Sequence, residues 1–308
     1  MTKATKNWEP WPELAYADWG ATADTLHMWT QIVGKVRLAL SPWVNHSWHV
    51  TLYVTPTGLT TGAMPAGSRT IEIAFDLVSH RLQLVASDGR AGDIPLRPMT
   101  VASFYAELMA QLEALDCGVT IIKTPNEVPN PIRFDEDEVH ESYDPAFASR
   151  FSAVLNSAHR VMSEFRAGFL GKCSPVHFFW GSFDLAVTRF SGRKAPEHPG
   201  GVEGLPDWVT REAYSHEVSS AGFWPGNADA PPLFYSYAYP TPEEFGARKV
   251  RPEAASFSEE LGEFVLPYDA VRQASSPDAA LMEFLESTYE AASDLAKWER
   301  DSLDFSLR

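Results

Sequence analysis

The sequence contains little cysteine and no long hydrophobic run. Only two cysteines occur in 308 residues, Cys117 and Cys173. They lie far apart, so two free thiols in a reducing cytosol are the simplest interpretation. No run of about 18 apolar residues is present that could cross a bilayer. No apolar stretch follows Lys3 and Lys6, so no signal peptide is predicted. We therefore expect a cytoplasmic protein with no membrane partner.

Basic residues are scarce relative to acidic ones. The chain has 25 Lys and Arg against 41 Asp and Glu, which gives a formal net charge of −16. A protein of this charge repels phosphate backbones and anionic lipid head groups. Nucleic acid is therefore not an expected partner, although a local basic pocket is compatible with the overall charge.

Familiar nucleotide-binding and hydrolase motifs are also absent. There is no P-loop, no GxGxxG after a strand, no GxSxG elbow and no CxxC. The pair His216-Glu217 lacks the second histidine that a zinc-protease helix requires. Cys173 and His177 lie about 13 Å apart in an extended chain at ~3.3 Å per residue, which argues against a Cys–His dyad.

What the chain does have is apolar and aromatic content. Hydrophobic residues make up 44% of the sequence, with 10 Trp and 18 Phe. This is enough for one large core or two smaller cores packed together.

Periodicity in the first part of the chain predicts a helix, antiparallel strands and a second helix. Apolar residues recur at helical spacing from about Asp24 to Leu40, and another helix begins at Thr100 and stops at Gly118. Period-two alternation predicts strands at residues 47–55, 70–77 and 81–86.

The segment 124–145 differs from its surroundings. It contains four prolines and the acidic run Asp135–Glu138, which we interpret as solvated linker. It predicts a boundary between an N-terminal half, 1–123, and a C-terminal half, 146–308.

The C-terminal half repeats the order of the first. A helix begins at Asp144-Pro145 and closes at Gly171, and a final helix runs from Ser276-Pro277 to Trp298. The predicted strands between them are residues 176–180, 183–190, 213–222, 233–239 and 262–266. The expected fold class is therefore α+β, with antiparallel sheets flanked by long helices in two similar helix–sheet–helix halves. No residue-level repeat relates the halves.

Residues 175–190 form the most informative segment. Gly181-Ser182 suits a two-residue hairpin turn, with a positive φ at the glycine. Phe179 then faces Asp184, and one side of the hairpin is apolar core. The other side carries His177, Phe179, Asp184, Ala186 and Thr188.

In this register His177 and Asp184 are diagonal neighbours on adjacent strands. An imidazole beside a carboxylate serves either a metal site or a general base. The competing interpretation is that the histidine is hydrogen-bonded to the aspartate only to satisfy a buried polar face.

Other histidines could join this pair. His198 lies in the loop after the hairpin, His216 lies in a later strand, and His49 shares a strand face with polar neighbours. Three histidines and an aspartate could hold zinc or iron. The predicted ligands are His177, Asp184, His198 and His216, although their spacing matches no recognised metal motif.

Two further polar patterns have plainer interpretations. His27, Gln31 and Lys35 form a stripe at i, i+4 spacing that we interpret as a solvated helix face. On the same helix, Lys35 and Arg37 could receive an anionic substrate. The tyrosines of the 233–239 strand are interpreted as core or sheet surface: Tyr235, Tyr237 and Tyr239.

These segments resemble DUF5996, a family of bacterial proteins of unknown function. The similar stretches are residues 26–38, 171–193, 211–217 and 221–226. The resemblance covers nearly the whole chain and implies one full-length family unit rather than two borrowed modules. It implies no activity, cofactor or catalytic residue.

Together these patterns favour an enzyme that acts on a small molecule at the polar face of the 176–190 hairpin. His177 would be a base or ligand and Asp184 its partner, with His216 and His198 as further ligands. With a bound metal the expected chemistry is hydrolytic or involves oxygen. Without a metal it is acid–base catalysis. The alternative is a non-catalytic small-molecule-binding or protein-interaction protein with structural histidines.

Overall fold

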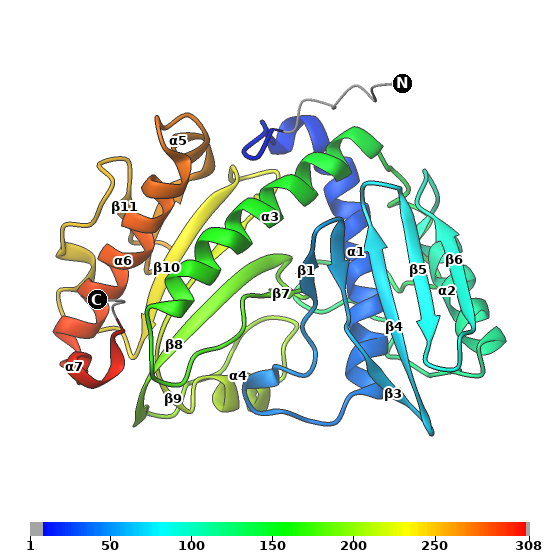
Figure 1. The fold of residues 1–308 in the computed structure, drawn as a ribbon, viewed down its shortest axis with the longest axis horizontal. Coiled ribbons are helices and arrows are strands. Elements are labelled where there is room, and N and C mark those ends of the chain that lie inside the picture. Colours follow the sequence, from blue (N-terminus) through cyan, green and yellow to red (C-terminus); the bar gives the residue numbers. More distant parts are fainter. Residues whose placement is uncertain (1–8, 306–308) are drawn as a thin grey trace.

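The computed structural model describes residues 9–305, which form two antiparallel sheets with helices packed against them (Figure 1). This confirms the α+β class. The long helices are α1 (Tyr16–Leu40), α2 (Val101–Ala114), α3 (Pro145–Ala167) and α6 (Pro277–Leu295). The short helices are α4 (Asp207–Ala213), α5 (Tyr268–Arg272) and α7 (Arg300–Leu303), with 3-10 turns at Asn45–Ser47 and Phe245–Ala247. Among the described residues, no helix combines the length and the apolar character that a membrane crossing requires.

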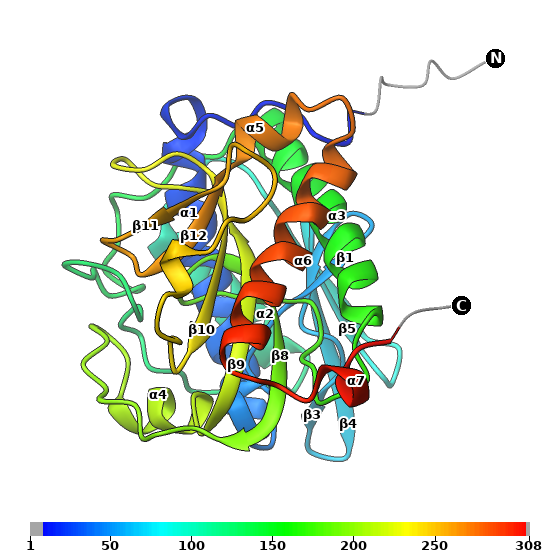
Figure 2. The same cartoon turned by 90° about the vertical axis from the view of Figure 1, so that its left-hand side faces the viewer.

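The predicted helix starts follow from local capping. Thr100 accepts a hydrogen bond from the backbone N–H of Ser103 at the start of α2. Asp144 caps α3 in the same way, with Pro145 in the first turn. α1 instead begins at Tyr16 rather than at Asp24, because its buried face continues through Trp19. α3 and α6 run side by side (Figure 2).

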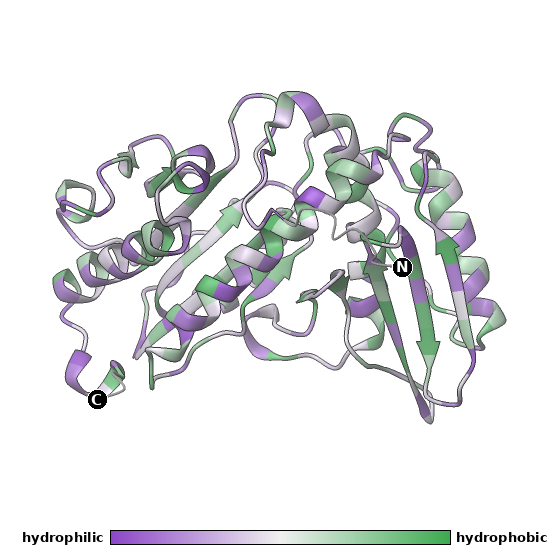
Figure 3. Cartoon of the chain, turned by 45° about the horizontal axis from the view of Figure 1, so that its top comes forward, coloured by the Kyte–Doolittle hydropathy of each residue, from purple (hydrophilic) through white to green (hydrophobic). Residues whose placement is uncertain are grey.

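The N-terminal sheet has the strand order β1-β2-β4-β5-β6, with β3 paired to β4. Its strands are β1 (Tyr53–Thr55), β2 (Gly58–Thr60), β3 (Met64–Ala66), β4 (Arg69–Asp76), β5 (Arg81–Ala86) and β6 (Ala91–Pro95). Hydrophobic and hydrophilic residues alternate along β4 and β5 (Figure 3). One face of the sheet is therefore buried and the other faces solvent.

The predicted strand at residues 47–55 is wrong except at its end. The chain makes a 3-10 turn at Asn45–Ser47, where His46 and Ser47 have positive φ values of 59° and 56°. The ring of Trp48 contacts His177 and Phe190 of the other sheet. The alternation in the sequence thus reflects an irregular segment lying against a second sheet, not a strand of its own.

The C-terminal sheet has the strand order β11-β12-β10-β9-β8-β7. Its strands are β7 (His177–Phe179), β8 (Asp184–Lys194), β9 (His216–Trp224), β10 (Leu233–Tyr239), β11 (Ser256–Ser258) and β12 (Glu263–Pro267). Phe179 pairs with Asp184 and His177 with Ala186, so the predicted hairpin register is confirmed.

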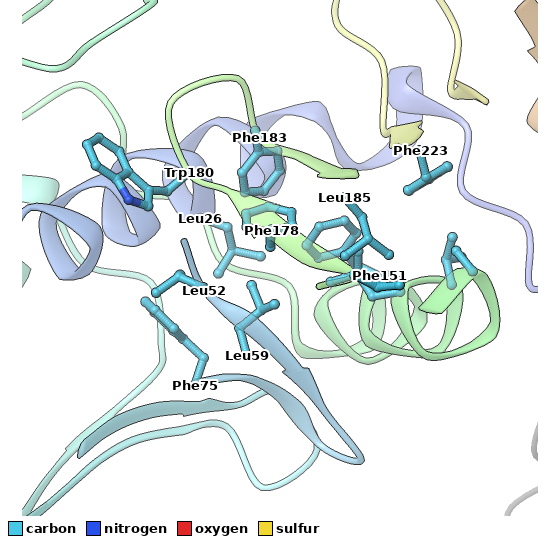
Figure 4. Packing of buried hydrophobic residues seen from close by; sticks show 14 of the residues in the cluster. Leu26, Leu52, Leu59, Phe75, Phe151, Phe178, Trp180, Phe183, Leu185 and Phe223 are labelled. Atoms are coloured by element: carbon cyan, nitrogen blue, oxygen red, sulfur yellow. The ribbon is translucent and has the colours of Figure 1, made fainter. Parts of the chain in front are cut away.

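The two sheets share one hydrophobic cluster. In Figure 4, Leu52 and Leu59 lie opposite Phe151 and Phe178. Leu52 and Phe178 also exchange backbone hydrogen bonds of 2.9 and 2.7 Å, which join the irregular 47–52 segment to β7. Trp180 is buried, as predicted, and its indole donates to the carbonyl of Val50 at 2.7 Å.

Residues 124–144 contain no helix or strand, and α3 begins at Pro145, but the segment is not all solvated linker. Asp137, in its acidic run, has no exposed surface. Its carboxylate accepts hydrogen bonds from the backbone N–H groups of Val139 and His140 and contacts the His140 ring at 2.7 Å. The interpretation as a solvated run is therefore wrong at Asp137. Part of this segment reaches the C-terminal sheet through Glu127.

Candidate functional site

The C-terminal sheet has two chemically different faces. α3 and α6 cover one, where Phe178, Leu185 and Phe223 are buried. The pairing of the strands places small and polar residues together on the other. We call this second surface the polar face, and its residues are His177, Asp184, Ala186, Thr188, Ser220, Gly222, Tyr235, Tyr237 and Glu263.

Asp184 stands at the start of β8 and is only 7% exposed. Its carboxylate accepts hydrogen bonds from the hydroxyls of Ser182 and Tyr235. Burial raises the pKa of Asp184, and these two hydrogen bonds oppose the rise. Burial, together with the charge of Asp184, raises the pKa of the Tyr235 phenol well above its ordinary value. The phenol therefore remains a proton donor to Asp184 at neutral pH.

Gly222 makes the contact between Tyr235 and Asp184 possible. It pairs with Ala186 on one side and with Tyr235 on the other. A Cβ added to Gly222 would lie 2.3 Å from the phenol end of Tyr235. The tyrosine ring therefore lies across the glycine toward β8, a close approach that a glycine inside a strand permits.

The charge of Asp184 acts on two further carboxyl groups. Glu127 comes from the 124–145 segment and Glu263 from β12, and both are half-buried. Burial, with a smaller contribution from the charge of Asp184, raises the pKa of each to about 7. Among residues 9–305, none of the three carboxyl groups forms an ion pair. They form an acidic cluster without a matching cation.

The carboxyl group of Glu127 packs against Gly181 in the hairpin turn. A Cβ on Gly181 would lie 2.1 Å from Oε1 of Glu127, so only glycine lets the carboxyl group come this close. The expected positive φ at Gly181 is wrong: the left-handed residue of the turn is Phe183, with φ 60°. What the glycine provides here is room for the end of the Glu127 side chain, not a left-handed backbone conformation. Glu127 is itself left-handed, with φ 57°.

The α1 stripe that we interpreted as solvated is buried against this turn. A ring nitrogen of His27 lies 2.8 Å from the carbonyl oxygen of Gly181. Gln31 donates to the carbonyl of Asn126 at 2.7 Å and accepts from its N–H at 2.8 Å. Lys35 donates to the side-chain oxygen of Asn126. The stripe therefore holds both the turn and the residue before Glu127 in place.

His177 lies on the polar face with Asp184, as predicted, but the two side chains are not hydrogen-bonded. The imidazole has no exposed surface, and neither ring nitrogen has a hydrogen-bond partner. Aromatic rings of Trp48, Tyr53 and Phe179 surround it. Burial, with smaller contributions from the charges of Arg166 and Arg37, lowers the pKa of His177 to about 3. The ring is therefore neutral at physiological pH.

The other two predicted ligands lie in different surroundings. The ring of His216 is 6.2 Å from that of His46, and its residue pairs with Lys194 at the far end of β8. His198 stacks on Tyr214, with 4.9 Å between ring centroids. Within the described part of the chain, no three His, Cys, Asp or Glu side chains form a group that could hold a metal ion. The four predicted ligands thus do not form one ligand set.

Two surface hollows lie away from Asp184 and His177. One of about 560 Å³ is lined by Glu217, Pro240, Glu244 and neighbouring residues. Another of about 480 Å³ lies beside Arg248 and Phe257. Neither involves Asp184 or His177, so the candidate site rests on side-chain chemistry rather than on the size of a hollow.

Sequence reasoning identified Asp184 but missed most of its neighbours. Tyr235, which bonds to it, and Glu127 and Glu263, on which its charge acts, come from distant segments, so no local spacing connects them. One available clue was Gly222, a glycine within a predicted strand, which often marks close approach of another group.

Comparison with known proteins gives one match. The model of a family of unknown function, DUF5996, matches residues 11–305. No curated protein and no solved structure matches the chain. The family match extends across both sheets and includes all three carboxyl groups of the acidic cluster. The chain therefore belongs to the DUF5996 family.

Proposed function

We propose that this protein is an enzyme that transforms a small polar molecule by general acid–base catalysis on the polar face. The observation that carries the proposal is the acidic cluster of Asp184, Glu127 and Glu263. Like charges brought together in a partly buried place destabilise the folded state unless a cation or a proton compensates them. No basic side chain in the described residues pairs with them. Such unmatched groups concentrate at functional sites.

The two glutamates suit proton transfer. A general acid or base works best when its pKa is near the working pH, and burial raises the pKa of Glu127 and Glu263 to about 7. We assign the exchange of a proton with the substrate to these two groups, which titrate together with Asp184 as a coupled set. Asp184 is held by Ser182 and Tyr235 and orients the cluster.

This proposal changes the role first expected for His177. An imidazole with a pKa of about 3 is a weak base at neutral pH. It remains a neutral group that offers one N–H donor and one acceptor. We propose that His177 contacts the substrate rather than removing a proton from it.

The surroundings of the cluster support a fixed geometry. Glu127 follows Asn126, which Gln31 and Lys35 of α1 hold by hydrogen bonds. Catalytic groups need such support, because a small displacement of a proton-transfer group costs much of its rate.

A non-catalytic small-molecule-binding protein is the second candidate. Aromatic rings flank the cluster, since Tyr214 shares a hydrogen bond of 2.9 Å with Tyr237 and also stacks on His198. An aromatic wall of this kind suits ligand binding without chemistry. The two candidates differ in whether a bound molecule is consumed.

Turnover of a mixture of small polar metabolites, followed by mass spectrometry, tests the proposal. The wild type should consume at least one compound, and Glu127→Gln and Glu263→Gln should each slow this by about 10²-fold or more. Glu72→Gln, which alters an exposed carboxylate of β4, should leave the rate unchanged. Consumption that persists in both glutamine variants would overturn the acid–base assignment. Binding without consumption would favour the second candidate.

A further inference from the structure

Arg37, on α1, is a buried cation without an anionic partner. Its residue is only 9% exposed, and its Nε has no hydrogen-bond partner. It forms no ion pair within residues 9–305, and its guanidinium lies 5.4 Å from the ring centroid of Tyr53. Its one favourable side-chain neighbour among the described residues is Tyr53, whose hydroxyl hydrogen-bonds the guanidinium and favours its charge. Buried arginines normally have a carboxylate or another anion beside them.

His177 lies beside the same tyrosine ring, and neither of its ring nitrogens has a hydrogen-bond partner among the described residues. Its ring centroid lies 6.4 Å from that of Tyr53, so Arg37 and His177 flank one aromatic ring. The charges of Arg166 and Arg37 both act on the imidazole. Two elements distant in sequence, α1 and β7, thus place polar atoms without a hydrogen-bond partner in the described residues beside the same tyrosine ring: Nε of Arg37 and both ring nitrogens of His177.

Within residues 9–305, the protein supplies no anion that pairs with Arg37. Among the described acidic side chains, Glu212 is the one that acts on the adjacent His49. Its carboxylate accepts a hydrogen bond of 2.6 Å from the backbone N–H of His46 and does not contact Arg37. Arg166 is exposed and donates to the carbonyl of Ser174. The neighbourhood of Arg37 and His177 is therefore basic in a protein of net charge −16.

We propose that Arg37 and His177 form an oxyanion-binding site, and that the substrate of this protein carries a carboxylate or phosphate group. The guanidinium would neutralise the anion, and an imidazole N–H would donate a hydrogen bond to it. The binding site is inferred from Arg37 and His177 alone. That its anion belongs to a substrate rests on the proposed function.

The position of the site also indicates the size of the substrate. His177 pairs with Ala186, and Asp184 lies two residues away on the same face of β8. Diagonal neighbours of this kind are about 7–8 Å apart. A small organic acid or phosphate ester could therefore place its anion at Arg37 and its reacting part beside the acidic cluster.

Calorimetric titration of the full-length protein with sodium phosphate, and separately with sodium acetate at the same ionic strength, tests the site. The wild type should bind at least one anion saturably, and Arg37→Gln and His177→Leu should each weaken binding tenfold or more. Arg251→Gln, which alters an exposed arginine beside Glu290, should bind as the wild type does. Preference for phosphate would indicate a phosphate ester and preference for acetate a carboxylic acid. Absence of saturable binding, or binding that survives both substitutions, would overturn the proposal.

Thermal unfolding separates a binding role for Arg37 from a structural one. Without anion, Arg37→Gln should unfold at or above the wild-type temperature, because it removes an unpaired buried charge. With anion, the wild type alone should gain stability. A structural arginine would instead lower the unfolding temperature in both conditions. Anion binding and thermal unfolding involve no turnover, so their results do not depend on the activity of the Glu127→Gln variant. The anion-binding site and the acid–base function can therefore fail independently.

Discussion

The N-terminal and C-terminal sheets differ in how their charged side chains are paired. Basic and acidic side chains on the N-terminal sheet and on the loops beside it lie next to each other. These matched pairs are Arg69 with Asp88, Arg81 with Asp93, and Arg90 with Asp88 and Asp116. On the polar face of the C-terminal sheet, Asp184 has only hydroxyl partners, and His177 has none.

This difference distinguishes scaffold from site. Matched charges at a surface cost the fold little and contribute little. Unmatched charges in a buried place lower the stability of the folded state, so a protein retains them where they serve binding or chemistry. Under our proposal, the N-terminal sheet supports the molecule and the C-terminal sheet carries the site.

Glycine substitutions should give the largest contrast between the sheets. A Cβ at Gly222 would lie 2.5 Å from the backbone oxygen of Leu185 as well as against Tyr235, and neither can move freely. A Cβ at Gly92 of β6 would meet only the end of the Gln111 side chain. We expect Gly222→Ala to lower the free energy of unfolding by about 2–3 kcal/mol, and Gly92→Ala to change it by about 0.5 kcal/mol or less.

Urea unfolding of both variants measures this contrast. Equal losses of stability would show that the close packing over Gly222 does not distinguish the polar face from the N-terminal sheet. A Gly222→Ala variant as stable as the wild type would mean that the Tyr235 ring can leave Asp184 without cost.

Glutamine substitution in the acidic cluster should give an intermediate, pH-dependent effect. Folded Glu127 keeps its proton up to about pH 7, whereas in the unfolded chain it loses the proton near its ordinary pKa of 4.5. Between these values the folded state binds more protons, so wild-type stability falls as the pH rises. After allowance for partial solvent exposure, the loss should be about 1–2 kcal/mol. Glu127→Gln should lack it and be more stable than the wild type at pH 8.

Urea unfolding at several pH values between 4 and 8 tests this effect. The exposed N-terminal-sheet variant Glu72→Gln should follow the wild-type pH dependence throughout. If Glu127→Gln shows the same slope with pH as the wild type, Glu127 is not protonated in the folded state near neutral pH, and the acidic cluster loses its distinction from surface carboxylates.

The features that the sequence predicts correctly are local. The caps at Thr100 and Asp144 depend on a few adjacent residues, and the pairing of Phe179 with Asp184 follows from alternation across a short turn. The strand predicted at 47–55 failed because contacts with another sheet, rather than pairing, set its pattern. Alternation alone does not distinguish these two causes.

The composition of the site depends on contacts over long separations. Tyr235 is 51 residues from Asp184, and Gln31 is 95 residues from Asn126. The α1 stripe is polar by composition, but its neighbours Met28 and Gly34 are buried as well. Apolar residues on both sides of a polar stripe indicate a helix that is covered all round. This pattern was the available clue that the stripe is not solvated.

The matched charges of the N-terminal sheet should show the smallest effect. Arg90 pairs with Asp88 at 2.9 Å and with Asp116 at 2.7 Å, and its side chain is 40% exposed. Solvent screens such pairs, and holding the long side chain in place costs entropy. Arg90→Gln should therefore change the free energy of unfolding by less than about 1 kcal/mol, and by less still at high salt. Urea unfolding at low and high sodium chloride measures both values. A loss well above 1 kcal/mol that salt does not reduce would mean that this network stabilises the fold strongly, and that matched and unmatched charges do not separate scaffold from site in this protein.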